Sequence, residues 1–117
     1  LTAWINDESW ENSYLEWLKS SNFNANDAIL VLSVGGGTEK VSKNLVVCMQ
    51  YAVQINAKIF AIVSRDGGKA KELSDVCVLV PVVNSQRITP HSESWQVILL
   101  HLIVNSLVEL KKAENPN

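Results

Sequence analysis

A run of five apolar residues leads into a loop with three consecutive glycines, and this junction constrains the fold more than any other feature. The run, Ala28–Leu32, is rich in branched side chains and is typical of a central strand covered on both faces. The loop reads Ser33-Val34-Gly35-Gly36-Gly37-Thr38, and a helical pattern follows it. Glycines let the backbone approach a ligand closely, and Thr38 can cap the next helix. The junction therefore predicts either an anion site, with phosphate as the guest, or a plain turn.

The glycine spacing does not match the standard nucleotide-binding motifs. It is neither G-x-G-x-x-G nor G-x-x-x-x-G-K-[ST], and Lys40 comes too late to serve as a P-loop lysine. The loop therefore gives little support to a dinucleotide or ATP site.

Apolar periodicity predicts helices and strands that alternate along the chain. The expected helices are 8–20, 39–55, 69–73 and 91–112, the expected strands are 28–32, 57–63 and 76–80, and 115–117 is an irregular tail. Short connections between such elements predict a parallel sheet flanked by helices on both sides, an α/β fold. Three strands make a thin sheet, and the last helix is apolar on nearly every face. We therefore expect an incomplete domain.

Composition narrows the functional classes. The 117 residues are 47% hydrophobic, enough for a core, and the net charge of -2 gives no broad basic field for nucleic acid. Cys48 and Cys77 stand among apolar neighbours and are predicted to be reduced core thiols. No long uncharged apolar stretch or signal peptide is recognisable, so we expect a cytoplasmic protein without a membrane contact.

The last helix carries the candidates for acid–base chemistry. His101 is either a core histidine or a general acid or base, since imidazole titrates near neutral pH. Glu93 is a second candidate, or merely a first-turn acid that the helix dipole favours. Eight residues separate the two, about 12 Å of rise and about 80° of rotation, so one helix does not easily bring both to one small ion. They could line one extended sugar site or belong to two sites completed by different subunits.

Other polar residues follow the strands. Ser33 and Ser64 are more plausible as phosphate or hydroxyl ligands than as activated nucleophiles, and Arg65 could help to bind an anion. Asp66-Gly67-Gly68 predicts a turn that starts a helix. The four tryptophans are predicted to be packing or interface residues.

Together these segments resemble the sugar isomerase (SIS) domain family. The resemblance rests on the strand and glycine loop 28–38, the strand ending Ser64-Arg65-Asp66-Gly67-Gly68, the Ser74-Asp75 step, and the helix from Thr89-Pro90-His91 to His101. The most similar branch is the phosphoheptose isomerases. It implies an SIS-type, flavodoxin-like three-layer sandwich, with residues 1–117 as the C-terminal portion of one SIS domain.

The resemblance also implies roles for particular residues. Ser33, Gly35, Gly36, Gly37 and Thr38 would hold the sugar phosphate, although Val34, Gly35 and Gly37 stand where relatives carry hydroxyl or amide side chains. His101 would move a proton between C1 and C2 of a phosphorylated heptose.

Glu93 stands eight residues before His101, where relatives have glutamine, and it is the second expected catalytic residue. His101 and Glu93 would be ligands if zinc were bound. Family members form tetramers with sites between subunits, so self-association as a homotetramer or dimer is expected. The alternative is a non-catalytic SIS module that senses a sugar phosphate or binds a protein partner.

Overall fold

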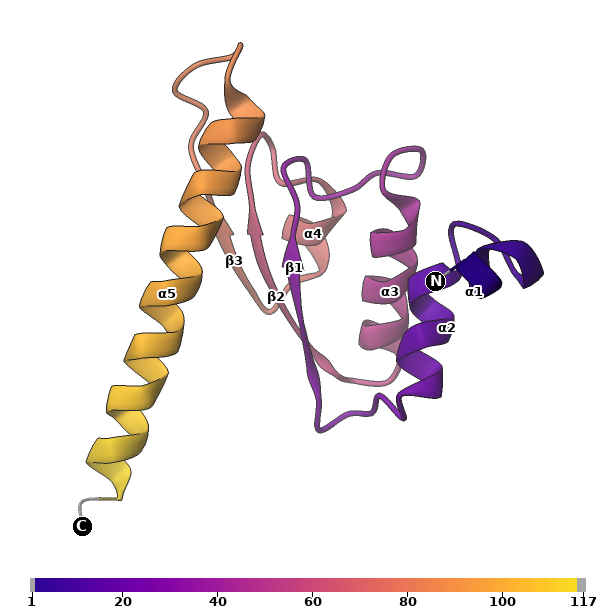
Figure 1. The fold of residues 1–117 in the computed structure, drawn as a ribbon, viewed down its shortest axis with the longest axis horizontal. Coiled ribbons are helices and arrows are strands. Elements are labelled where there is room, and N and C mark those ends of the chain that lie inside the picture. Colours follow the sequence, from indigo (N-terminus) through magenta and orange to yellow (C-terminus); the bar gives the residue numbers. More distant parts are fainter. Residues whose placement is uncertain (1, 116–117) are drawn as a thin grey trace.

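The structure, a computed structural model, describes residues 2–115, so the end of the expected tail at 116–117 lies outside the described residues. Figure 1 shows helices and strands in alternation after two N-terminal helices. Their bounds are α1 Thr2–Asp7, α2 Ser13–Ser20, β1 Ala28–Leu32, α3 Lys43–Gln54, β2 Lys58–Val63, α4 Gly68–Leu73, β3 Val76–Leu79 and α5 Ile88–Glu114.

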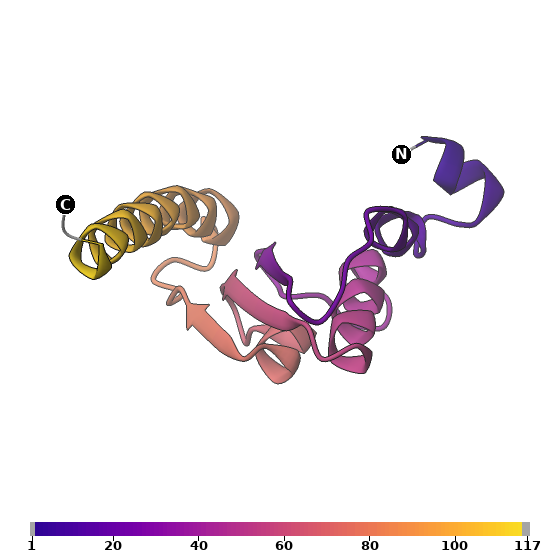
Figure 2. The same ribbon diagram turned by 90° about the horizontal axis from the view of Figure 1, so that it is seen from below.

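The three strands form one parallel sheet in the order β1-β2-β3. Ala28 of β1 pairs with Lys58, and Phe60 of β2 pairs with Val76 of β3. Helices α3 and α4 cover one face, α2 packs outside α3, and α5 crosses the other face (Figures 1 and 2). The predicted α/β fold with helices on both sides of a parallel sheet is confirmed.

The core lies between α3 and the sheet. Met49 of α3 is fully buried and belongs to the same cluster as Ile59 of β2, which is 1% exposed. Cys48 is a free, buried thiol, and burial raises its pKa to about 11. Cys77 is free and half-buried, and partial burial raises its pKa as well. Cys48 is thus a core residue as expected, whereas Cys77 lies at the margin of the core.

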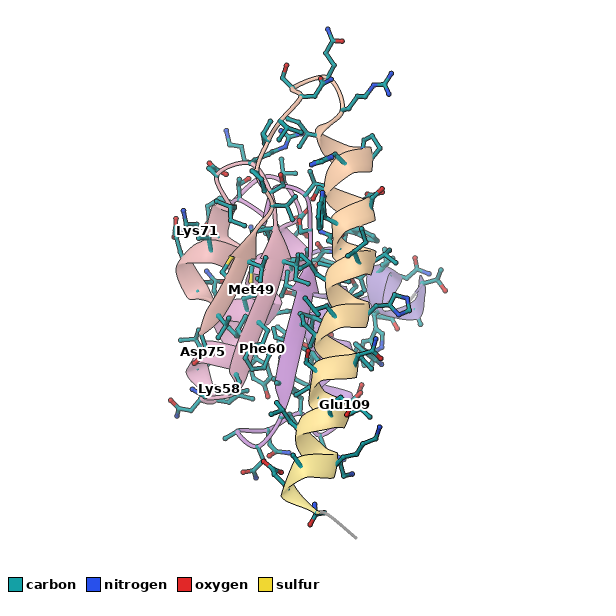
Figure 3. All side chains as sticks on the ribbon, turned by 90° about the vertical axis from the view of Figure 1, so that its left-hand side faces the viewer. Met49, Lys58, Phe60, Lys71, Asp75 and Glu109 are labelled. Atoms are coloured by element: carbon teal, nitrogen blue, oxygen red, sulfur yellow. The ribbon has the colours of Figure 1, made fainter. Side chains whose placement is uncertain are left out.

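An ion pair joins the start of β2 to the start of β3. The Asp75 carboxylate accepts hydrogen bonds from Lys58 Nζ at 2.7 Å and from the backbone N–H of Ile59 at 2.9 Å (Figure 3). These two donors favour the ionised form and lower the pKa of Asp75. The contact lies at the end of the sheet opposite the glycine loop, where β2 and β3 begin.

The sheet and α5 leave apolar surface exposed. The expectation that 28–32 is a central strand is wrong for the described residues: β1 is an edge strand, and Leu30 and Leu32 are 46% and 41% exposed. A groove of about 520 Å³ runs between α5 and the sheet and is lined almost wholly by apolar side chains. The predicted lack of neighbours for the last helix is confirmed, because most of its large apolar residues are exposed.

Three helices differ from their predicted bounds. The helix expected over 8–20 begins only at Ser13; residues 8–12 are not helical, and here Ser9 Oγ accepts from the Asn12 amide and Ser13 Oγ donates to the Trp10 carbonyl. The expected helix at 39–55 begins only at Lys43. By contrast α5 begins at Ile88, since Pro90 falls in its first turn, where proline is tolerated. None of the helices within residues 2–115 is long and apolar enough to cross a membrane.

Candidate functional site

A cleft of about 850 Å³ opens at the carboxyl ends of the strands. The loops after β1 and β2 form most of it, Val82 adds an apolar side chain from the segment between β3 and α5, and Ile88 adds another from the start of α5. Its lining is Ser33, Val34, Gly35, Gly37, Thr38, Val41, Ser42, Arg65, Asp66, Val82 and Ile88. The carboxyl end of a parallel sheet is where α/β proteins commonly bind ligands.

The glycine loop has its own hydrogen bonds. Ser33 Oγ accepts from the Gly36 amide at 3.1 Å, and Thr38 Oγ1 accepts from the amides of Lys40 and Val41 at 3.2 and 3.0 Å. Each hydroxyl thereby braces one end of the loop and keeps its own proton to donate to an acceptor. The expectation that Thr38 caps the following helix is wrong: it closes a tight turn over 38–41, and the residue before the helix is Ser42.

The glycine loop packs directly on the turn that precedes α4. A Cβ on Gly36, whose φ is +71°, would lie 1.8 Å from the Gly67 carbonyl oxygen. A Cβ on Gly68 would lie 2.4 Å from the Gly35 oxygen. The backbone N–H groups of Lys69 and Ala70 donate to the carbonyls of Gly37 and Gly36, both at 2.9 Å. The loops after β1 and β2 therefore form one backbone-to-backbone unit.

Gln96 connects α5 to the same end of the sheet. Its side chain is 7% exposed, and Nε2 donates to the Ile62 carbonyl at 3.0 Å and to the Ser33 carbonyl at 3.3 Å. Ser92, one turn earlier on the helix, is fully buried, and its Oγ has no hydrogen-bond partner within residues 2–115. A buried polar face of α5 thus meets the ends of β1 and β2. The sequence analysis missed Gln96, because a polar residue in an apolar helix carries no signal of its partner.

The structure brings most of the predicted loop residues together. Ser33, Gly35, Gly37 and Thr38 line the cleft, whereas Gly36 is buried against the Gly67 carbonyl. Arg65 and Asp66 join them from the neighbouring strand end.

The two predicted catalytic residues on α5 do not line this cleft. Glu93 and His101 are both exposed. His101 is therefore not the buried core histidine of the alternative interpretation. It stands 13 residues beyond Ile88 on a continuous helix, about 20 Å along the axis. It is also five residues beyond Gln96, about 7.5 Å of rise and about 140° of rotation, so His101 stands on a different face of α5 from the residue that touches Ser33.

The described residues do not fit a zinc site by themselves. No group of three or more histidine, cysteine, aspartate or glutamate side chains within 2–115 converges as metal ligands do. Protein zinc sites take three or four such donors, and the two predicted ligands, Glu93 and His101, fall short of that number.

Comparisons with known proteins agree with this architecture. No family model matches the chain. A phosphoheptose isomerase of Helicobacter pylori is 27% identical over 107 residues, which cover 92% of this chain and 51% of that protein. The solved phosphoheptose isomerase GmhA from Neisseria gonorrhoeae superposes with a TM-score of 0.73 at 25% identity, over 91% of this chain and 55% of that chain. In sequence and in fold this chain is similar to phosphoheptose isomerases.

Two further relatives set the limits of this likeness. The lincomycin biosynthesis protein LmbN of Streptomyces lincolnensis is 31% identical over 87% of this chain and 38% of its own length. A phosphoheptose isomerase structure from Francisella tularensis has a TM-score of 0.62 at 22% identity and supports the fold alone. The chain spans about half the length of the phosphoheptose isomerases that it matches. The three-stranded sheet is accordingly an incomplete SIS-type α/β fold.

Proposed function

We propose that this chain is the C-terminal portion of a sugar-phosphate isomerase, with a phosphorylated heptose as substrate. The observation that carries the proposal is the cleft at the strand ends, lined by Ser33, Thr38 and Arg65 in a phosphoheptose isomerase-like fold. Hydroxyl donors, backbone amides and a guanidinium suit a phosphate group. The sugar would extend from the cleft.

The proposed reaction moves a proton between C1 and C2, which interconverts ketose and aldose. A general base removes the proton from one carbon and returns it to the other, and the carbonyl oxygen gains the proton that the neighbouring hydroxyl loses. We propose His101 for this proton transfer, with Glu93 as a second acid–base group. Since His101 is exposed and does not line the cleft, it would serve a site completed by another subunit or by chain outside these residues.

This arrangement calls for self-association, and the exposed apolar surface of α5 supports it. Leu102, Val108 and Leu110 are 59%, 46% and 60% exposed on a helix that makes few contacts with its own sheet. A dimer or tetramer that buries this surface would bring His101 of one subunit near the cleft of another.

The activity assay uses sedoheptulose 7-phosphate and the full-length protein. We expect turnover by the wild type and a loss of about a hundredfold or more in His101→Ala, the typical contribution of a general acid or base. His91→Ala is the matched control, because His91 is the other histidine of the chain and packs edge-on near Trp95. Equal turnover by the wild type and His101→Ala would remove His101 from catalysis.

A second candidate function is a non-catalytic module that binds a sugar phosphate. The observation that favours it is that His101 does not line the cleft, because binding needs only the cleft. Binding of sedoheptulose 7-phosphate without any turnover by the full-length wild type would select this function.

A further inference from the structure

Arg65 has a backbone conformation that arginine seldom adopts. Its φ is +54°, in the left-handed region. The turn around it is held on both sides: the Ser64 amide donates to the Val34 carbonyl at 2.9 Å, and Ser64 Oγ donates to the Val80 carbonyl at 2.8 Å. On the other side Gly67 packs against the glycine loop. The surrounding structure therefore imposes a strained conformation on Arg65, as is often found at functional sites.

The Arg65 side chain lies along the glycine loop. A Cβ built on Gly35 would be 3.8 Å from Arg65 Cδ, an ordinary van der Waals distance. The residue is exposed and lines the cleft, and its guanidinium has no hydrogen bond or ion pair to any residue in the described range. The position thus brings an unpaired cation to the mouth of the predicted phosphate loop.

The charge of the cleft depends on this residue. Among the described lining residues Arg65 is the one cation and Asp66 the one acid. Asp66 Oδ1 accepts a hydrogen bond from the Gly68 amide at 3.2 Å, so this carboxylate has a structural role in the turn before α4. The loop itself supplies two hydroxyl side chains, Ser33 and Thr38. Arg65 is therefore the one positive charge in the described lining that can balance a doubly charged group.

We propose that Arg65 is the residue that recognises the charge of the ligand, and that the ligand class is a phosphomonoester dianion. This inference rests on the proposed sugar-phosphate function and deepens it. A guanidinium can donate two parallel hydrogen bonds to one phosphate, and such charged pairs are stronger than bonds from hydroxyls. The left-handed backbone of Arg65 places its side chain beside Gly35. We infer that this conformation costs folding stability and favours ligand binding.

The test measures binding and stability of the same variants of the full-length protein. Isothermal titration uses sedoheptulose 7-phosphate, unphosphorylated sedoheptulose and inorganic phosphate with Arg65→Gln, Arg65→Lys and Arg65→Gly. We expect Arg65→Gln and Arg65→Gly to weaken sedoheptulose 7-phosphate binding by between about tenfold and a hundredfold, the usual value of a hydrogen bond to a charged group. Arg65→Lys keeps the positive charge and should weaken sedoheptulose 7-phosphate binding less than the other two substitutions do. Lys111→Gln, an exposed cation in the last turn of α5, is the matched control and should bind as the wild type does.

Thermal unfolding supplies the second measurement. Glycine adopts positive φ without strain, so Arg65→Gly should raise the unfolding midpoint while it weakens binding. Weaker binding with a lowered midpoint in every variant would show a merely structural role and overturn the proposal.

The outcomes distinguish a failure of the role of Arg65 from a failure of the proposed sugar-phosphate function. If Ser33→Ala weakens sugar-phosphate binding and Arg65→Gln does not, the phosphate site stands and the role of Arg65 is wrong. If the wild type binds none of the phosphate ligands, both are wrong. Binding of inorganic phosphate and sedoheptulose 7-phosphate, with none of sedoheptulose, supports the phosphate group as the source of recognition.

Discussion

The Gln96 side-chain amide donates a hydrogen bond of 3.3 Å to the carbonyl of Ser33, the residue that opens the glycine loop. Two elements 63 residues apart thereby meet at the candidate site. The same amide nitrogen also binds the Ile62 carbonyl, so α5 is attached to the ends of β1 and β2 together. The position of the loop thus depends on the last helix as well as on its own turn.

Replacing Gln96 tests this attachment. Gln96→Ala removes the side-chain donor from the Ser33 and Ile62 carbonyls, of which Ile62 still accepts from the Ser33 amide at 3.3 Å, and we expect the free energy of unfolding to fall by about 1–3 kcal/mol. Urea denaturation measures the change. Gln50→Ala, at an exposed position on α3, is the matched control and should change it by less than about 0.5 kcal/mol. Equal losses in both variants would contradict the proposed attachment.

The contact between the two loops predicts unequal effects of neighbouring glycines. Gly36→Ala places a Cβ against the Gly67 carbonyl at positive φ, and should cost at least about 2 kcal/mol of stability. Gly35→Ala meets only Arg65 Cδ at 3.8 Å and should cost less than about 1 kcal/mol. Thermal or chemical denaturation of the two variants measures the difference in stability. Similar stabilities would show that the loops are not packed as described.

The Asp75 ion pair predicts a pH dependence of stability. Contacts with Lys58 and the Ile59 amide lower the pKa of Asp75 in the folded state, so its contribution is present above the ordinary value of about 3.9 and is lost as the pH falls through the folded pKa. Unfolding of the wild type and Asp75→Asn should therefore differ at pH 7 and converge in acid. A constant difference across this range would contradict the lowered pKa.

The exposed face of α5 predicts self-association. Ile98 and Leu102 are 53% and 59% exposed and stand one turn apart. Replacing both with glutamate puts charge where we expect an interface, and should raise the dissociation constant by at least about tenfold. Sedimentation velocity of the full-length protein measures it, with Ala113→Glu in the last turn as control. An unchanged mass distribution would place the interface elsewhere.

Local patterns predicted the strands well. The apolar run Ala28–Leu32 is a strand with the expected bounds, and the glycine loop follows it at the edge of a cleft. Position in the sheet was not predictable in the same way. A continuous apolar run indicates that both faces carry apolar side chains, yet it does not say which strand pairs on either side.

The start of α3 and the surroundings of His101 show where sequence patterns are insufficient. Thr38 could cap a helix or close a turn with its own neighbours. In the structure the amides of Lys40 and Val41 donate to Thr38 Oγ1, so the residue closes a turn. On α5 apolar residues occupy nearly every face, so periodicity could not say which way His101 points. The left-handed conformation of Arg65 carries no compositional signal at all.

The most direct test of a phosphate site in the cleft is a backbone amide NMR titration of the full-length protein with sedoheptulose 7-phosphate. We predict the largest shift changes at 33–38 and 65–66, with small changes in the apolar groove between α5 and the sheet. Changes centred on that groove, or none at saturating ligand, would contradict the account.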